Sequence, residues 1–302
     1  MTARTMVVVM VSGLLMGALL NAGTLAATAA GQSPGWRRDA AVAATDVLGS
    51  VSGTLRLDRP RAWIDDALGR AAPGAAIAPG PASPGGVFVP TPVRPARLLV
   101  AGDSLTDTFG PALVNRSGAT GVVDSRRELQ FSSGLNRVVY DWPARLADQL
   151  TEHPADIVVF MIGANDGVPI ETPTGWVGSD TEAWKVAYGL RVATAMEVLT
   201  ARVPTVYWVG MPIVRSEQLA RKVAVMNEIF RREAERHPGV RFVDPWPLFA
   251  DTTGGYTQSL PDGSGRTVLM RRPDGVHFTA AGAEHLTDAV WDAIGHDWRI
   301  KP

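Results

Sequence analysis

The chain has 302 residues, of which 46% are hydrophobic, and this is enough for one sizeable α/β catalytic domain with additional segments. Its formal net charge of −1 lacks the positive field with which nucleic-acid-binding proteins gather phosphates, so we expect no nucleic-acid partner. The absence of cysteine excludes disulfides, thiolate nucleophiles and cysteine-ligated metal sites.

The first 30 residues have the composition of a membrane-directed segment. No charged side chain occurs from Met6 to Ala30, and Arg4 precedes this stretch. Residues 1–30 are therefore either an uncleaved signal anchor that crosses the bilayer or a secretory signal peptide that is cleaved near Ala27–Ala29. In both cases we expect the catalytic domain outside the cytoplasm, tethered to the membrane or secreted.

Two further segments precede the predicted domain. Residues 31–70 are predicted to form a short helical stalk. Residues 71–95 contain repeated Pro-Gly pairs, which favour an extended, solvated linker. We place the domain boundary near Arg94 and the catalytic domain at residues 96–302.

Short β-branched runs alternate with amphipathic stretches after the linker. This alternation predicts an α/β fold of three layers, α/β/α, around a five-stranded parallel sheet. In such sheets, chemistry collects at the carboxyl ends of the strands. The predicted strands are Arg97–Ala101, Gly121–Asp124, Asp156–Ile162, Thr205–Gly210 and Val240–Asp244. The predicted helices are Trp142–Thr151, Thr181–Ala201, Glu217–Arg236 and Ala280–Ile294.

The first candidate for chemistry is Ser104, in the turn Gly-Asp-Ser-Leu-Thr that follows the first predicted strand. A sharp turn from strand to helix would expose its hydroxyl and point its backbone N–H into the same space. A serine hydroxyl is too weakly acidic to attack unaided, so it requires a base and a third group that holds the base. A turn-forming role is the alternative for this motif alone.

A base and an acid are predicted near the C-terminus, in the motif Asp274-Gly-Val-His277. This spacing lets the Asp274 carboxylate fold back onto His277 Nδ1, which selects the tautomer whose Nε2 faces Ser104. Thr279 follows as a candidate N-cap of the last predicted helix. A structural role is the alternative for either residue of the pair.

Two other motifs offer hydrogen-bond donors for the negative charge that acyl transfer develops on a carbonyl oxygen. The side-chain amide of Asn165, after the third predicted strand, would project toward the sheet edge, while Asp166 is expected to cap or brace the loop. Gly134 could bring its backbone N–H close to a substrate oxygen because no side chain obstructs it, although it could equally be a turn glycine. Each such donor lowers a barrier by roughly 3–4 kcal/mol in studied enzymes.

In order and context these four motifs resemble those of the SGNH/GDSL hydrolase family, over residues 97–297. The resemblance implies a flavodoxin-like SGNH hydrolase fold. It also implies Ser104 as nucleophile and oxyanion donor, Gly134 and Asn165 as the other oxyanion donors, and Asp274 with His277 as the rest of a catalytic triad. More specifically, the chain resembles a membrane-attached bacterial branch of uncharacterised function, related to domains that handle acyl groups on cell-envelope glycans.

Two segments beside these motifs, Val168–Asp180 and Asp251–Arg272, are predicted to be unusually large loops. They contain two aromatic residues and two arginines that could stack on a sugar or pair with an acidic substrate, with loop anchoring as the alternative. These residues are Trp176, Tyr256, Arg271 and Arg272.

The motifs together predict a serine esterase or acyl hydrolase acting on an acylated carbohydrate of the cell envelope or on a small ester. An O-acyltransferase with the same triad, and a catalytically silent glycan-binding or assembly protein, are the alternative functions. No histidine spacing typical of a metal site and no phosphate-binding glycine loop occur, so we expect no metal and no cofactor.

Overall fold

The computed structural model describes residues 88–136, 140–173, 175–179, 181–262 and 264–300, together with Ala43. The fold below is that of the compact unit to which the described residues from Phe88 onward belong, apart from Thr252–Gly255. The predicted signal segment, stalk and first part of the linker lie outside the described residues, except that Ala43 is helical. Within the described part of the chain, no helix has the length and apolar content needed to span a membrane.

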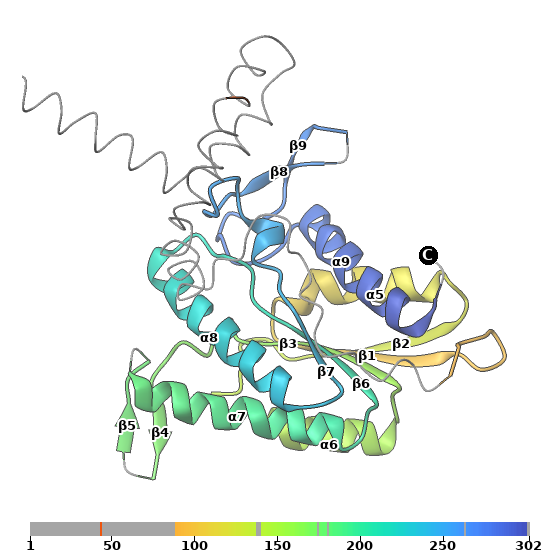
Figure 1. Ribbon diagram of the computed structural model, residues 1–302, viewed down its shortest axis with the longest axis horizontal. Coiled ribbons are helices and arrows are strands. Elements are labelled where there is room, and N and C mark those ends of the chain that lie inside the picture. Colours follow the sequence, from red (N-terminus) through yellow and green to blue (C-terminus); the bar gives the residue numbers. More distant parts are fainter. Residues whose placement is uncertain are drawn as a thin grey trace, which may run out of the picture. The chain divides into compact units, whose positions relative to one another are not determined.

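The centre of the fold is a sheet of five parallel strands in the order β2-β1-β3-β6-β7 (Figure 1). The first strand of the sheet is β1, and the chain then crosses to the edge strand β2. Strands β3, β6 and β7 follow in order on the other side of β1, which is the flavodoxin-like order. The topological switch therefore lies between β1 and β3. The strands are β1 (Ala96–Gly102), β2 (Val123–Leu129), β3 (Ile157–Met161), β6 (Thr205–Val209) and β7 (Val240–Val243).

Helices cover both faces of this sheet, so the predicted three-layer α/β/α fold is confirmed. Helices α5 and α9 pack together on one face, and α6, α7 and α8 cover the other (Figure 1). The helices are α5 (Thr106–Gly118), α6 (Trp142–Glu152), α7 (Glu182–Thr200), α8 (Glu217–Arg236) and α9 (Ala280–Trp298). The predicted N-cap of α9 is confirmed, because the Thr279 hydroxyl accepts the Gly282 N–H at 3.1 Å.

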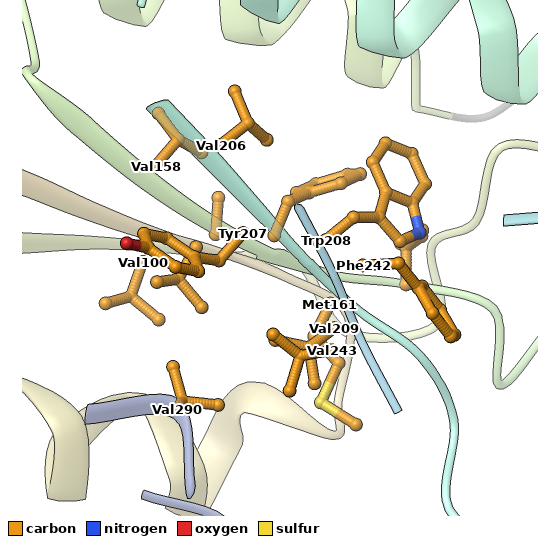
Figure 2. Packing of buried hydrophobic residues seen from close by; sticks show 14 of the residues in the cluster. Val100, Val158, Met161, Val206, Tyr207, Trp208, Val209, Phe242, Val243 and Val290 are labelled. Atoms are coloured by element: carbon orange, nitrogen blue, oxygen red, sulfur yellow. The ribbon is translucent and has the colours of Figure 1, made fainter. Parts of the chain in front are cut away.

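The core lies on both faces of the central strands β3 and β6, whose residues are all buried. Figure 2 shows Tyr207 and Val209 on the side of Val290 from α9, and Trp208 on the opposite side. There the Trp208 ring lies 5.4 Å from the Phe230 ring of α8. Because both faces are covered, these strands are continuous apolar runs, which is why their bounds were predictable.

Three sequence-based expectations about elements differ from the structure. The second strand is Val123–Leu129 rather than Gly121–Asp124, because this edge strand carries half-exposed polar residues and lacks an apolar run. Each of the two predicted loops contains a small antiparallel hairpin. The hairpins are β4 (Ile170–Thr172) with β5 (Gly175–Val177), and β8 (Ser259–Pro261) with β9 (Thr267–Leu269). A short 3-10 helix, η1 (Pro247–Phe249), follows β7.

The end of the predicted linker packs against the domain instead of extending into solvent. The Phe88 ring lies edge-on to the Trp298 ring of α9, with centroids 5.8 Å apart, and the Arg94 guanidinium lies 4.1 Å from the Phe88 ring. Pro90 is buried. The packed domain therefore begins before the predicted boundary at Arg94.

Candidate active site

The turn that carries Ser104 depends on Gly102 at the end of β1. Gly102 has a φ of +157°, and a Cβ at this position would lie 1.9 Å from the Met161 carbonyl oxygen of β3. Only glycine allows the two strands to approach so closely. The chain then leaves the sheet and α5 begins at Thr106, which leaves Ser104 half-buried at the carboxyl end of β1.

Ser104 lies within hydrogen-bond reach of His277, as the motifs predict. The distance from Ser104 Oγ to His277 Nε2 is 2.9 Å, and His277 Nδ1 lies 3.0 Å from Asp274 Oδ2. A carboxylate can only accept, so Nδ1 carries the proton and Nε2 is left to accept the Ser104 hydroxyl. The structure thus brings the three predicted triad residues together in the predicted tautomer.

The backbone around Asp274 favours its ionised form. Asp274 Oδ1 accepts the N–H of Val276 at 2.7 Å and the N–H of His277 at 2.9 Å. Partial burial favours the neutral acid, but these two donors and the His277 imidazole outweigh it and lower the pKa of Asp274 to about 2. The carboxylate is therefore negative at neutral pH, which is the state that stabilises a positive imidazole.

The predicted oxyanion donors Gly134 and Asn165 both lie beside Ser133, which precedes Gly134 in the sequence. Asn165 Nδ2 donates to the Ser133 carbonyl oxygen at 2.9 Å, and its other amide hydrogen has no partner among the described residues. Among the described residues, the backbone N–H groups of Ser104 and Gly134 also have no hydrogen-bond acceptor. Unpaired donors from the segments that follow β1, β2 and β3 are thus available for a developing negative charge.

Asp166, which the sequence predicts to cap or brace its own loop after β3, braces the neighbouring loop that contains Gly134. Its buried carboxylate accepts the N–H of Leu135 at 3.1 Å, the N–H of Asn136 at 2.9 Å and the Tyr188 hydroxyl at 2.8 Å. Burial raises the pKa of Asp166, and the same donors oppose this rise. Because Asp166 directly follows Asn165, one short segment positions both predicted oxyanion donors.

Asp103 is a residue of the site that the sequence reasoning missed. Its fully buried carboxylate accepts N–H groups from Leu105 at 2.9 Å, Gly163 at 3.1 Å and Ala164 at 3.0 Å. It therefore ties the Ser104 turn to the turn after β3. One signal in the sequence points to this role, because Asp103 directly follows a strand that has no solvated surface. A carboxylate buried at such a position needs hydrogen-bond donors.

Arg271 is not accessible to a substrate, so the prediction that it contacts one is wrong. Its side chain is fully buried, and its guanidinium carbon lies 5.4 Å and 5.0 Å from the ring centroids of Phe249 and Phe278. After β9 the chain folds back onto the core, and the Arg271 N–H donates to the Gln258 carbonyl oxygen at 3.2 Å. Burial lowers the pKa of Arg271 to about 10, so the side chain stays charged at neutral pH.

For the other three loop residues, Trp176, Tyr256 and Arg272, contact with a substrate stays a prediction. Trp176, on β5, is 69% exposed. The ring of Tyr256 lies 5.6 Å from the Arg215 guanidinium and is half-buried. Arg272 forms an ion pair with Asp107 of α5 at 3.2 Å, which links the His277 turn to the helix that follows Ser104.

A match to a protein family covers most of the packed domain. Residues 97–293 match a family described as a protein of unknown function, DUF459. The chain belongs to the DUF459 family. The DUF459 region runs from β1 into α9 and contains all the predicted triad and oxyanion residues. No functionally curated protein matches this chain.

This DUF459 domain is similar to domains in solved structures. A catalytic mutant of Axe2, an acetylxylan esterase from Geobacillus stearothermophilus, matches with a TM-score of 0.50 and 16% identity, over 68% of this chain and 97% of that chain. LAE5, an α/β hydrolase enzyme from the metagenome of Lake Arreo, Spain, matches with a TM-score of 0.49 and 18% identity, over 66% of this chain and 95% of that chain. The likeness to Axe2 confirms the fold expected from the SGNH/GDSL motifs.

Gly134→Ala should destabilise the domain, because the added Cβ would lie 2.0 Å from Asp166 Oδ1. Either the loop or the carboxylate must move, and we expect the free energy of unfolding to fall by about 1–3 kcal/mol in denaturant titrations. Gly118→Ala is the matched control, since nothing lies within 4 Å of its Cβ, and it should change stability by less than about 0.5 kcal/mol. Equal effects of the two substitutions would contradict this reading of the Gly134 loop.

Asp103→Asn should change how stability depends on pH. Burial raises the pKa of Asp103 to about 7, although the Leu105 and Ala164 N–H groups oppose the rise. The folded state then binds more protons than the unfolded state between about pH 4 and pH 7, so this group contributes stability below pH 4 that is lost as the pH rises to 7. The free energy of unfolding of wild type minus that of D103N should therefore fall over this interval, by up to about 4 kcal/mol. A difference that is constant or rises with pH would contradict the assigned burial effect.

Proposed function

We propose that this protein is a serine esterase that cleaves a carboxylic ester through an acyl-Ser104 intermediate. The observation that carries the proposal is the pair of contacts at His277, 2.9 Å from Nε2 to Ser104 Oγ and 3.0 Å from Nδ1 to Asp274 Oδ2. General-base activation of a serine hydroxyl requires contacts of this kind and in this order.

In the first half-reaction, Ser104 Oγ attacks the ester carbonyl carbon while His277 Nε2 takes the hydroxyl proton. The new Oγ–C bond forms as the carbonyl π electrons move onto oxygen, which gives a tetrahedral oxyanion. The Asp274 carboxylate stabilises the positive imidazole. The Nε2 proton then passes to the leaving alcohol oxygen as its bond to carbon breaks, and an acyl-serine remains.

The oxyanion would be bound by the backbone N–H groups of Ser104 and Gly134 and by Asn165 Nδ2. These donors are already held in place before substrate binds, because Asp103 and Asp166 fix the turns that carry them. Removing one donor of this kind costs roughly 3–4 kcal/mol of transition-state stabilisation.

Water completes the reaction in a second half-reaction, in which water is the nucleophile and Ser104 Oγ is the leaving group. His277 Nε2 takes a proton from water, the water oxygen bonds to the acyl carbon, and Ser104 Oγ leaves with the proton as the acid is released. If a sugar hydroxyl took the place of water, the same residues would transfer the acyl group. The acceptor therefore separates an esterase from an O-acyltransferase.

For the substrate we propose an acetylated carbohydrate of the cell envelope. Axe2, which has the same fold, is named an acetylxylan esterase. The predicted signal segment would carry the domain to the compartment where envelope glycans lie. The exposed indole of Trp176 offers a surface on which a sugar ring could stack.

Ser104→Ala should reduce hydrolysis of p-nitrophenyl acetate, and acetate release from isolated envelope fractions, by about 10⁴-fold or more. Asp274→Asn should lower kcat by up to about 10⁴-fold, because the neutral amide no longer selects the tautomer of His277. Asp288→Asn, which alters an exposed carboxylate of α9, is the matched control and should keep full activity. Activity that survives Ser104→Ala would rule out the proposal, and acetyl transfer to an added sugar in place of acetate release would identify a transferase.

We also propose that residues 1–30 direct the domain out of the cytoplasm. Cell fractionation should recover the protein in the membrane fraction if the segment is an anchor, or outside the cytoplasm if it is cleaved. N-terminal sequencing of the purified protein separates the two forms. Recovery of the intact chain in the soluble cytoplasmic fraction would contradict this proposal, and a chain that lacks residues 1–30 provides the reference for cytoplasmic retention.

A further inference from the structure

We propose that Arg271 is a positioning residue of the active site, which acts on Asp274 and His277 through the peptide group between Val276 and His277. The inference rests on the proposed esterase function, because it assigns Arg271 a part in the same reaction. Arg271 would not contact the substrate.

A continuous line of hydrogen bonds joins Arg271 to Ser104. Arg271 Nη2 donates to the Val276 carbonyl oxygen, and the N–H of the same peptide group, on His277, donates to Asp274 Oδ1 at 2.9 Å. The other oxygen of Asp274 accepts His277 Nδ1 at 3.0 Å, and His277 Nε2 lies 2.9 Å from Ser104 Oγ. A change at Arg271 therefore reaches the serine through bonded or hydrogen-bonded atoms alone.

The burial of Arg271 is poorly compensated, which indicates a role other than stability. The side chain is fully buried, yet its Nε and Nη1 atoms have no hydrogen-bond partner among the residues that the structure describes. Within the described ranges no carboxylate forms an ion pair with it, and the rings of Phe249 and Phe278 provide only cation–π contact. Burying a charge with so few partners costs free energy, and such costs concentrate at functional sites.

The guanidinium acts on the catalytic turn through one peptide group. A charged donor on the Val276 carbonyl polarises this group, so the His277 N–H becomes a stronger donor and holds Asp274 in the orientation that His277 Nδ1 requires. Asp274 in turn holds the imidazole in the orientation in which Nε2 accepts the Ser104 proton.

Other charged or titratable groups surround the same turn, but they differ from Arg271 in exposure. Arg215 is exposed, and the Arg272 side chain is 40% exposed and already paired, so solvent and the paired carboxylate screen both charges. The surrounding groups are Asp274 in the turn, Arg215 after β6, Arg272 with its partner Asp107 of α5, and Tyr256.

The test compares Arg271→Met and Arg271→Lys with wild type, using p-nitrophenyl acetate as the substrate. Methionine can occupy the space between the two phenylalanine rings without a charge or a donor. Arg271→Met should lower kcat by about 10- to 100-fold with KM little changed. Arg271→Lys keeps a charged donor, so its kcat should lie between those of Arg271→Met and wild type.

Arg266→Met is the matched control, because Arg266 lies in the β8–β9 hairpin with a side chain that is 81% exposed. It should behave as wild type. A folded Arg271→Met variant with unchanged kcat, or with a loss that appears in KM alone, would overturn the inference. If that variant does not fold, Arg271→Lys decides, and a kcat equal to wild type would overturn the inference. Absence of Ser104-dependent activity in both wild type and Arg266→Met would instead overturn the proposed function itself.

Discussion

The carboxylate of Asp103 joins the ends of strands β1 and β3 at the point where the predicted chemistry lies. The ladder between β1 and β3 ends at the pair Gly102 and Met161, so strand pairing alone does not fix the turns beyond it. Asp103 fixes them with three backbone donors, one from its own turn and two from the turn after β3. The position of the Ser104 hydroxyl relative to Asn165 depends on these bonds.

Asp166 performs the same task between the turn after β3 and the segment after β2. Both carboxylates are buried, and each is held by backbone N–H groups rather than by a positive side chain. Such groups are costly to bury, but once satisfied they specify one arrangement of the backbone. Gly102 and Gly134 allow this close approach, because a Cβ at either position would overlap the neighbouring backbone or carboxylate. The predicted oxyanion donors are thus organised without any contribution from substrate.

Much of this arrangement could be predicted from the sequence, for physical reasons that also explain what could not. Strands β3 and β6 are buried on both faces and are therefore continuous apolar runs, whereas the edge strand β2 is polar and its bounds were misplaced. The pairing of Asp274 with His277 follows from local spacing in one turn. Two of the three backbone partners of Asp103, Gly163 and Ala164, are 60 and 61 residues away, and no local pattern identifies them. Arg271 was misjudged because its burial depends on how β8, β9 and the following residues fold back onto Phe249 and Phe278, which a charged residue in a loop-like segment does not reveal.

In the proposed reaction, Ser104 forms a covalent acyl intermediate with the help of His277. Acid-quenched mixtures of the purified protein with p-nitrophenyl acetate, digested and examined by mass spectrometry, test it most directly. We expect one acetyl group on the peptide that contains Ser104, and we expect it to form more slowly in His277→Ala. Turnover of the ester with no adduct on this peptide, or an adduct that forms equally fast in His277→Ala, would contradict it.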